Sequence, residues 1–208
     1  MNFLALITNN YIWILYSLLI KYILVFFYKF KIGKNFFIKG TPNLRLTGSE
    51  YITIGNDVKI LGNIDLRTRE KGKITIDNNV KIEENCRFVA AKNGFIYLGE
   101  GTVVGANAIW NGGGDIKIGK NCIFSARTSI NANEHDFAKQ NKNSNLNLHF
   151  NYGDVMIEDE CFFGVNTSVA LNTKIEKGAV IGAHSFVNTN LEPFSINAGC
   201  PAKKIRSR

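Results

Sequence analysis

Acidic side chains are absent from both ends of this 208-residue chain. No Asp or Glu precedes Glu50 and none follows Glu192, although lysines and arginines occur in both terminal stretches. The first 49 residues contribute +6 and the last 16 contribute +4 to a net charge of +8, which leaves −2 for the body between them. The body therefore lacks the basic stripe with interleaved aromatic residues that a nucleic-acid groove requires, and we expect no nucleic-acid partner.

Cysteine and histidine are scarce, and their spacing does not suit a metal site. The four cysteines include no CxxC pair, which argues against zinc and redox motifs and favours a reducing compartment. The three histidines, His135, His149 and His184, are separated by 14 and 35 residues, unlike the ligands of a three-histidine zinc site. The sequence thus predicts no metal ion.

The chain is long enough for one domain with a buried core and short additional segments. The first of these segments is apolar. Residues 11–28 contain Ser17 and Lys21 as their only strongly polar side chains, so they predict a helix that is apolar on every face. This segment is slightly shorter than the roughly 20 residues of a membrane span, and a central lysine would cost about 2.5 to 3.5 kcal/mol there. A helix packed on the domain base or on a neighbouring subunit, and a helix lying on a membrane surface, are therefore both favoured over a span.

The charges that follow this helix indicate where the domain lies. Lysines come after the apolar run rather than before it, which argues against a cleaved secretory leader. At a membrane they would keep the domain on the cytoplasmic side. We expect a cytoplasmic protein, either free or at the inner face of the cytoplasmic membrane.

A six-residue repeat dominates the remaining sequence. Aliphatic or aromatic residues recur at every sixth position, often followed by Gly or an acid, and this period fits short strands joined by tight turns and stacked as a solenoid. Three sides give a coil of 18 residues, and starts at 54, 76, 98 and 118 imply extra residues at some corners. The repeat positions are Ile54 and Ile60, then Ile76, Ile82 and Phe88, then Leu98 and Val104, then Ile118, Phe124 and Ile130, then Ile157, Phe163, Val169, Ile175, Ile181 and Val187.

Three cysteines occupy regular positions within the same six-residue repeat. Cys86, Cys122 and Cys161 each lie four residues after a repeat position, in a slot that elsewhere holds small residues. We interpret them as buried and chemically inert side chains, since buried thiols in apolar surroundings are poor nucleophiles.

Together, the repeat, the segment Asn-Glu-His-Asp-Phe at 133–137 and the ending Ala-Gly-Cys-Pro-Ala-Lys-Lys-Ile at 198–205 resemble the hexapeptide-repeat acyltransferases. The likeness is greatest to the sugar O-acetyltransferases that modify capsule, exopolysaccharide and O-antigen. The resemblance implies a left-handed parallel β-helix, acetyl-CoA as co-substrate, a saccharide acceptor, and a homotrimer with active sites between subunits.

On this basis the chain divides into four segments. We expect an N-terminal apolar helix over 1–30, a lead-in segment over 31–51, a catalytic β-helix over 52–192, and a short C-terminal tail that contacts coenzyme A over 193–208. A polar loop over 138–153, rich in asparagine, interrupts the repeat and is expected to project beside the substrate site.

His135 is the candidate general base. Transfer of an acetyl group from a thioester to an alcohol requires removal of the hydroxyl proton, which an imidazole with a pKa of about 6.5 performs well near neutral pH. His135 ends a repeat run just before the projecting loop, whereas His149 and His184 are interpreted as loop and corner residues. Asn111, Asn133 and Asp136 are the candidate acceptor-binding residues, because they lie near His135 or about one coil before it.

The cofactor residues follow from the resemblance. Gly164 is expected to contact the cofactor and to supply an oxyanion donor, and Ala170 and Ala183 are expected to let the pantetheine arm lie close to the coil. Lys203, Lys204 and Arg206 resemble the cations that meet coenzyme A phosphates.

Two other functions stay open at this stage. One is N-acetylation of an amino sugar or a nucleotide-linked amino sugar, which an imidazole base would also serve. The other is a non-catalytic, membrane-associated solenoid scaffold. A membrane-bound N-terminus would favour a lipid-linked or polymeric saccharide as acceptor.

Overall fold

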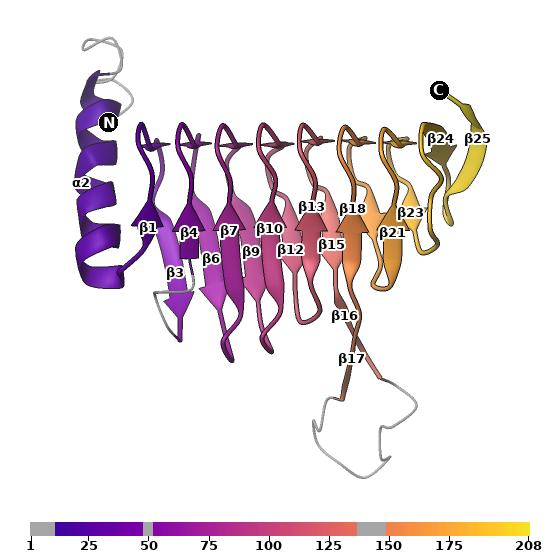
Figure 1. The fold of residues 1–208 in the computed structure, drawn as a ribbon, viewed down its shortest axis with the longest axis horizontal. Coiled ribbons are helices and arrows are strands. Elements are labelled where there is room, and N and C mark those ends of the chain that lie inside the picture. Colours follow the sequence, from indigo (N-terminus) through magenta and orange to yellow (C-terminus); the bar gives the residue numbers. More distant parts are fainter. Residues whose placement is uncertain (1–10, 48–51, 137–148) are drawn as a thin grey trace.

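The repeat folds as a parallel solenoid with three faces, shown by a computed structural model that describes residues 11–47, 52–136 and 149–208 (Figure 1). Sheet A contains β1 (Lys31–Ile32), β4 (Ile52–Ile54), β7 (Lys73–Ile76), β10 (Phe95–Leu98), β13 (Ile116–Ile118), β18 (Val155–Ile157) and β21 (Thr173–Ile175). Sheet B contains β2 (Phe37–Ile38), β5 (Lys59–Ile60), β8 (Lys81–Ile82), β11 (Val103–Val104), β14 (Ile123–Phe124), β19 (Phe162–Phe163), β22 (Val180–Ile181), β24 (Ser195–Ala198) and β25 (Lys203–Ser207). Sheet C contains β3 (Pro42–Leu46), β6 (Ile64–Thr68), β9 (Cys86–Ala90), β12 (Ile109–Asn111), β15 (Ser129–Asn131), β20 (Ser168–Val169) and β23 (Phe186–Val187). The predicted left-handed parallel β-helix is confirmed.

The coil length shortens along the solenoid. On sheet A, residues in register are 22 apart from β4 to β7 and from β7 to β10, 20 apart from β10 to β13, and 18 apart from β18 to β21. The step from β13 to β18 is 39 residues, because an insertion leaves the solenoid between these two strands. The extra residues of the early coils therefore lie at corners and do not disturb the register.

The interior is filled by the residues that the period predicts. All sixteen predicted repeat positions are at most 3% exposed. Trp110 continues the run from Val104 and is also fully buried, stacked on Phe88 with ring centroids 4.7 Å apart. Contacts between successive coils thus form one continuous apolar core.

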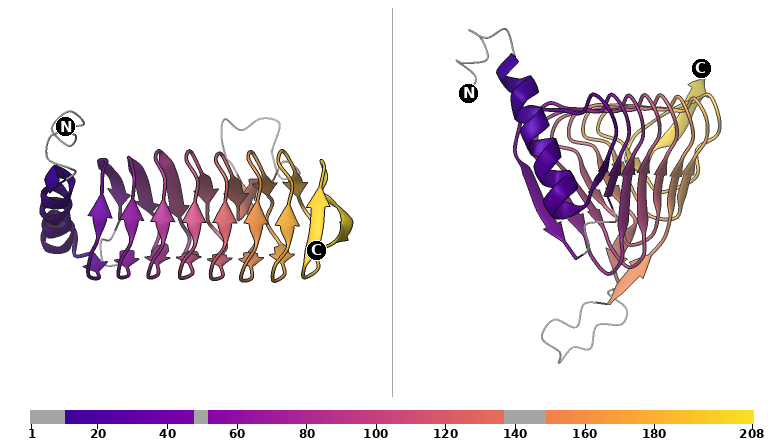
Figure 2. Two further views of the ribbon diagram at one scale, coloured as in Figure 1. Left: turned by 90° about the horizontal axis from the view of Figure 1, so that it is seen from above. Right: turned by 60° about the vertical axis from the view of Figure 1, so that its left-hand side comes forward.

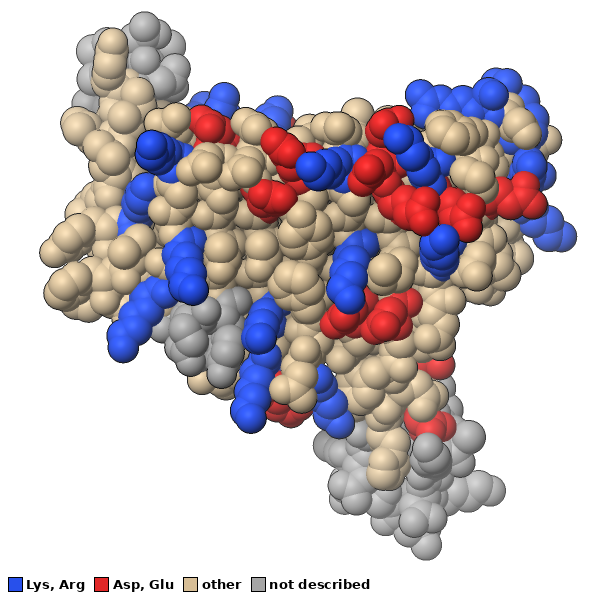
Figure 3. All heavy atoms as spheres, viewed as in Figure 1, with Lys and Arg blue, Asp and Glu red and all other residues tan. Residues whose placement is uncertain are grey.

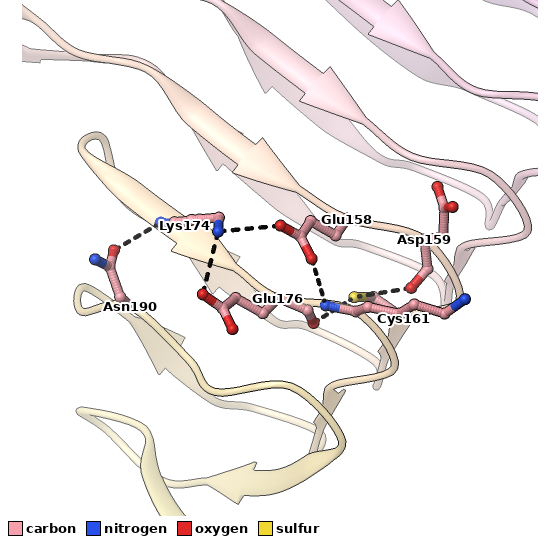
Figure 4. A network of polar contacts seen from close by, with 7 residues as sticks. Glu158, Asp159, Cys161, Lys174, Glu176 and Asn190 are labelled. Carbon is pink, nitrogen blue, oxygen red and sulfur yellow. Dashed lines mark hydrogen bonds and ion pairs between the residues drawn. The ribbon is translucent and has the colours of Figure 1, made fainter.

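Buried thiols and surface ion pairs tie the C-terminal coils together. The Cys161 thiol lies 3.3 Å from the carbonyl oxygen of Glu176 on the next coil, within the network of Figure 4. On the surface above it, Lys174 Nζ contacts Glu158 at 3.0 Å and Glu176 at 3.1 Å. Cys86, Cys122 and Cys161 are all buried, as their small-residue slots predict.

The apolar helix closes the N-terminal end of the solenoid. Helix α2 (Tyr11–Tyr28) lies across the first coil and buries Trp13, Ser17 and Leu24 against it (Figure 2). Ser17 Oγ accepts the N–H of Ile38 at 2.8 Å, and Lys21 donates to the carbonyl of Gly33. The helix therefore satisfies edge groups of the first strands, and packing on the domain base is the observed arrangement.

Two segment boundaries differ from the expectation. The described part of the predicted lead-in 31–51 is the first coil, because β1, β2 and β3 pair in parallel with β4, β5 and β6. Ile32, Ile38 and Leu44 already carry the six-residue spacing there. At the other end, the predicted C-terminal tail over 193–208 contains β24 and β25, the last two strands of sheet B, which pair antiparallel and continue the solenoid.

Candidate active site

A β-hairpin projects from the corner between sheets C and A, where the insertion leaves the solenoid (Figure 1). Its strands are β16 (Asn133–His135) and β17 (Phe150–Tyr152), paired antiparallel, and we call residues 133–136 and 149–152 the arm. The predicted loop thus begins as an ordered hairpin, and residues 137–148 of it lie outside the described residues. Because the arm starts from a rigid coil, the position of its base is fixed by the sheets.

Glycine lets the arm pack closely on the preceding coil. A Cβ atom at Gly113 would lie 2.4 Å from Cδ1 of Tyr152, so a larger residue would displace that ring from its position. Beside it, Asn133 Nδ2 donates to the carbonyl of Gly112 at 2.9 Å. The base of the arm is therefore held against the coil by ring packing and by a hydrogen bond.

His135 lies on the arm opposite Phe150. The two ring centroids are 4.4 Å apart, and the imidazole is half-buried with its Nδ1 atom inaccessible to solvent. The neighbouring Asp136 is buried, and its N–H donates to the carbonyl of His149 at 2.8 Å. Phe150 therefore covers one side of the candidate base and helps to fix its orientation.

The predicted acceptor residues gather at this corner. Asn111 on β12 is in register with Asn131 on β15 and donates to its Oδ1 at 2.9 Å. Arg87 Nη2 on β9 lies 3.4 Å from Asn111 Oδ1. Stacking of coils thus brings Asn111 beside the base of the arm, which itself carries Asn133 and His135.

A pocket of about 320 Å³ opens beside the arm, and Asn111 and Asn133 line it. Most of its other lining residues were missed by the sequence analysis. Those that bear charge or an aromatic ring are Arg67, Arg69, Glu70, Arg87, Lys92, Phe150 and Tyr152. The sequence does contain a pattern that links some of them, because Arg67, Val89 and Asn111 are spaced by the 22-residue coil length. This spacing can be recognised only when the register of the strands is known.

The predicted cofactor residues divide between two corners. Ala170 follows β20 at the corner between sheets C and A, one coil beyond the arm. Gly164 and Ala183 lie between sheets B and C, and a Cβ atom at Gly164 would be 2.5 Å from the backbone N of Ala183. The N–H of Gly164 donates to the carbonyl of Ile181 at 2.8 Å, so this amide is engaged in the solenoid and does not serve as the expected oxyanion donor here.

The predicted phosphate-binding cations lie on the last strand. Lys203, Lys204 and Arg206 are exposed on β25, and Lys204 Nζ pairs with Glu192 at 2.6 Å. The solenoid views show β25 at the C-terminal end and away from the corner that bears the arm (Figure 2). Within one chain, the candidate base and the candidate cofactor cations are therefore separated.

No protein-family profile matches the chain, but curated relatives are found. The bifunctional protein GlmU of Rubrobacter xylanophilus is 36% identical over 93 residues, which are 45% of this chain and 17% of that protein. A chloramphenicol acetyltransferase of Klebsiella aerogenes is 41% identical over 56 residues, 27% of each chain. The putative colanic acid biosynthesis acetyltransferase WcaF of Escherichia coli is 31% identical over 97 residues, 46% of this chain and 49% of that protein. The chain thus spans at most about half the length of these relatives.

Solved structures share the fold over most of the chain. The polysialic acid O-acetyltransferase OatWY has a TM-score of 0.63 and 20% identity, covering 86% of this chain and 88% of that one. The N-acyltransferase AntD of Bacillus cereus, solved with dTDP and coenzyme A, has a TM-score of 0.58 and 24% identity, covering 86% and 84%. At these identities the likeness establishes the fold.

Proposed function

Since this chain is a homologue of the hexapeptide-repeat acetyltransferases, we propose that it transfers acetyl from acetyl-CoA to a hydroxyl of a bacterial surface saccharide or its precursor. The observation that carries this proposal is the position of His135. It lies half-buried on the arm, beside a pocket lined by polar and charged side chains.

In the proposed reaction His135 acts as general base. With Nδ1 buried, Nε2 is the nitrogen that meets the acceptor hydroxyl. The hydroxyl oxygen attacks the thioester carbonyl carbon while Nε2 takes its proton, and collapse of the tetrahedral adduct breaks the C–S bond. The imidazolium then returns the proton to the departing thiolate, so no covalent enzyme intermediate is required.

Asn111, Asn133 and Asp136 would orient the acceptor. The first two line the pocket, and Asp136 directly follows His135 on the arm. An acceptor held by these groups would place its hydroxyl near His135, which raises the rate by positioning.

Coenzyme A would bind along the C-terminal coils. Lys203, Lys204 and Arg206 are exposed and have the charge that its phosphates require. Gly164, Ala170 and Ala183 present little side-chain bulk along these coils, where the pantetheine arm would lie. In a homotrimer a neighbouring subunit could supply these groups to the groove containing His135, and we therefore propose a trimer with shared sites.

N-acetylation is the second candidate, favoured by the likeness of the fold to that of AntD, which is named as an N-acyltransferase. An imidazole base serves an amine as well as an alcohol. The linkage in the product distinguishes the two reactions.

Helix α2 provides a route to membrane association. The face turned away from the solenoid carries exposed apolar side chains, including Leu15, Leu18 and Phe26 at 64%, 58% and 65% exposure. By length and composition the helix could cross a bilayer, but its inner face is occupied by the solenoid. We propose that the protein is cytoplasmic and lies on the inner face of the membrane through α2, near a lipid-linked or polymeric acceptor.

The decisive experiment compares thiol release from acetyl-CoA by the wild type and by His135→Ala, with saccharides and amino sugars as acceptors. Loss of a general base lowers turnover by about 100-fold or more. His149→Ala is the matched control, because among the described residues the contact of His149 with Asp136 is made by its main-chain carbonyl, which the substitution keeps. Full activity in His135→Ala would refute the assignment of the base, and no transfer to any acceptor by the wild type would favour a non-catalytic scaffold.

A further inference from the structure

The pocket beside the arm is strongly basic, which acetyl transfer by itself does not require. Its lining includes Arg67, Arg69, Arg87 and Lys92, with Glu70 as the single acid among the lining residues. Figure 3 shows Lys and Arg side chains gathered along the lower edge of the solenoid, between the grey segments. Because the body of the chain is slightly acidic overall, this concentration of positive charge is local.

The cations come from successive coils at one corner. Arg67 and Arg69 belong to the coil of β6, and Arg87 and Lys92 belong to the coil of β9. The next two strands of sheet C, β12 and β15, pair in register beyond β9 and lead to the base of the arm. The basic surface is therefore a track over two neighbouring coils, and β12 and β15 continue from it to the arm carrying His135.

Arg87 has an unsatisfied donor at this track. Its Nε is buried and has no hydrogen-bond partner among the described residues, while Nη2 makes a long contact of 3.4 Å to Asn111. A buried guanidinium N–H without an acceptor is unfavourable and calls for a partner. Arg87 also lines the pocket, where a carboxylate or phosphate oxygen would accept a charge-assisted bond from its guanidinium.

Two of the other cations are also free to act on a ligand. Arg67 is paired with Asp65 at 2.5 Å, so its charge is largely offset. In contrast, within the described part of the chain no carboxylate pairs with Arg69 or Lys92. Lys92 Nζ instead lies 4.8 Å from the ring centroid of Tyr152 on the arm, which links the track to the candidate site.

We propose that the acceptor is anionic, and that Arg87, Arg69 and Lys92 bind its carboxylate or phosphate groups while the hydroxyl to be modified meets His135. This inference rests on the proposed function and names its substrate class. A uronic-acid-type saccharide would supply carboxylates, and a nucleotide-linked sugar would supply a diphosphate.

Binding by the full-length protein without acetyl-CoA tests the pocket independently of catalysis. Titration calorimetry would use oligogalacturonate as the carboxylate probe, UDP-glucose as the diphosphate probe and a dextran oligosaccharide as the neutral probe. We expect one acidic probe to bind more tightly than dextran, with an affinity that falls as salt is added. Arg87→Gln and Lys92→Asn should each weaken that binding by about tenfold or more, as loss of a charge-assisted contact predicts. Asn is chosen at position 92 because it tolerates the left-handed backbone found there (φ 50°).

Lys81→Gln is the matched control, since Lys81 is a half-buried lysine on sheet B of the coil that also carries Arg87, and it pairs with Glu83 instead of lining the pocket. Equal binding of acidic and neutral probes, or unchanged affinity in both pocket variants, would overturn the proposal. The identity of the acidic probe that responds decides between carboxylate and diphosphate.

Parallel thiol-release assays separate this inference from the proposed function. If an acidic probe binds in a way that depends on Arg87 but no thiol is released, the anion-binding site is supported and acetyl transfer is rejected. Turnover of dextran that is indifferent to Arg87→Gln would keep the transferase and reject the anionic acceptor. If both proposals hold, the pocket variants raise KM for the acidic acceptor by about tenfold and leave KM for acetyl-CoA unchanged.

Discussion

At the scale of single residues, Gly113 sets how closely the arm returns to the solenoid. Its hydrogen atom faces the ring of Tyr152, whose own exposure is 37%, so the ring lies on the backbone rather than in the core. Tyr152 also contacts Lys92, and its register on β17 fixes that of Phe150 and His135. A methyl group at position 113 therefore acts on the site through the arm.

We predict that Gly113→Ala lowers kcat/KM for the acceptor by about 10-fold to 100-fold, because displacing the arm misplaces the base. The melting temperature should change little, since Tyr152 can move outward into solvent. Steady-state kinetics together with thermal unfolding would measure both. In a Tyr152→Ala background the same substitution should have no further effect, and an additive loss would show that the ring contact is not the cause.

The cysteines illustrate residues whose role is packing. Burial raises the pKa of the Cys86 thiol to about 11, so it is almost entirely protonated near neutral pH. Cys122 and Cys161 lie in the equivalent slot of later coils, buried among backbone carbonyl groups. All three fill the interior of the solenoid.

At the scale of elements, helix α2 has two faces with different roles. Trp13, Ser17 and Leu24 on the inner face cover the open end of the solenoid, whereas the outer face contacts nothing in the described chain. An end of a solenoid that is left open exposes apolar side chains and unpaired strand groups. The inner face therefore protects the fold, and the outer face remains for a second surface.

We predict that replacing Leu15, Leu18 and Phe26 together by Ser abolishes flotation of the protein with vesicles that contain anionic lipid. Each of these side chains would contribute about 1.5 to 3 kcal/mol if fully buried in the membrane interface. The circular dichroism spectrum should be unchanged, because the three positions face outward. Absence of flotation by the wild type would reject membrane attachment, and a change in oligomeric mass in the triple variant would instead assign this face to another copy.

At the scale of the whole molecule, the solenoid places the arm and β25 at different corners and far from each other. The arm leaves the corner between sheets C and A, and the cations of β25 extend sheet B at the C-terminal end. A rigid solenoid cannot bend to bring them together within one chain. A site that uses both groups therefore needs a second copy.

We predict that two inactive variants complement each other in mixed oligomers. His135→Ala lacks the proposed base, and the triple replacement of Lys203, Lys204 and Arg206 by Gln lacks the proposed cofactor cations. In random trimers formed at equal amounts, about a quarter of the shared sites would combine an intact base with intact cations from the neighbour. Activity that reappears only on co-expression would support shared sites, whereas two variants that stay inactive together would place each site within one subunit.

Much of the fold could be read from the chain alone. Each coil repeats the same short pattern, so the six-residue period identified the interior at sixteen positions and placed the cysteines. The position of His135 at the end of a run, followed by a polar insertion, indicated a projecting segment. The first coil escaped notice, although Ile32, Ile38 and Leu44 have the same spacing, because its strands follow directly on the apolar helix.

Tertiary structure alone decided how residues from different coils combine. Arg67, Arg87 and Lys92 are unremarkable surface cations in sequence, and they become one pocket with Phe150 and Tyr152 only when coils of 22, 20 and 39 residues come into register. Likewise, the separation of His135 from β25 depends on the corner at which each leaves the solenoid. The period of the interior is local and visible in the chain, whereas contacts across the outer surface depend on corner lengths that must be summed along the whole solenoid.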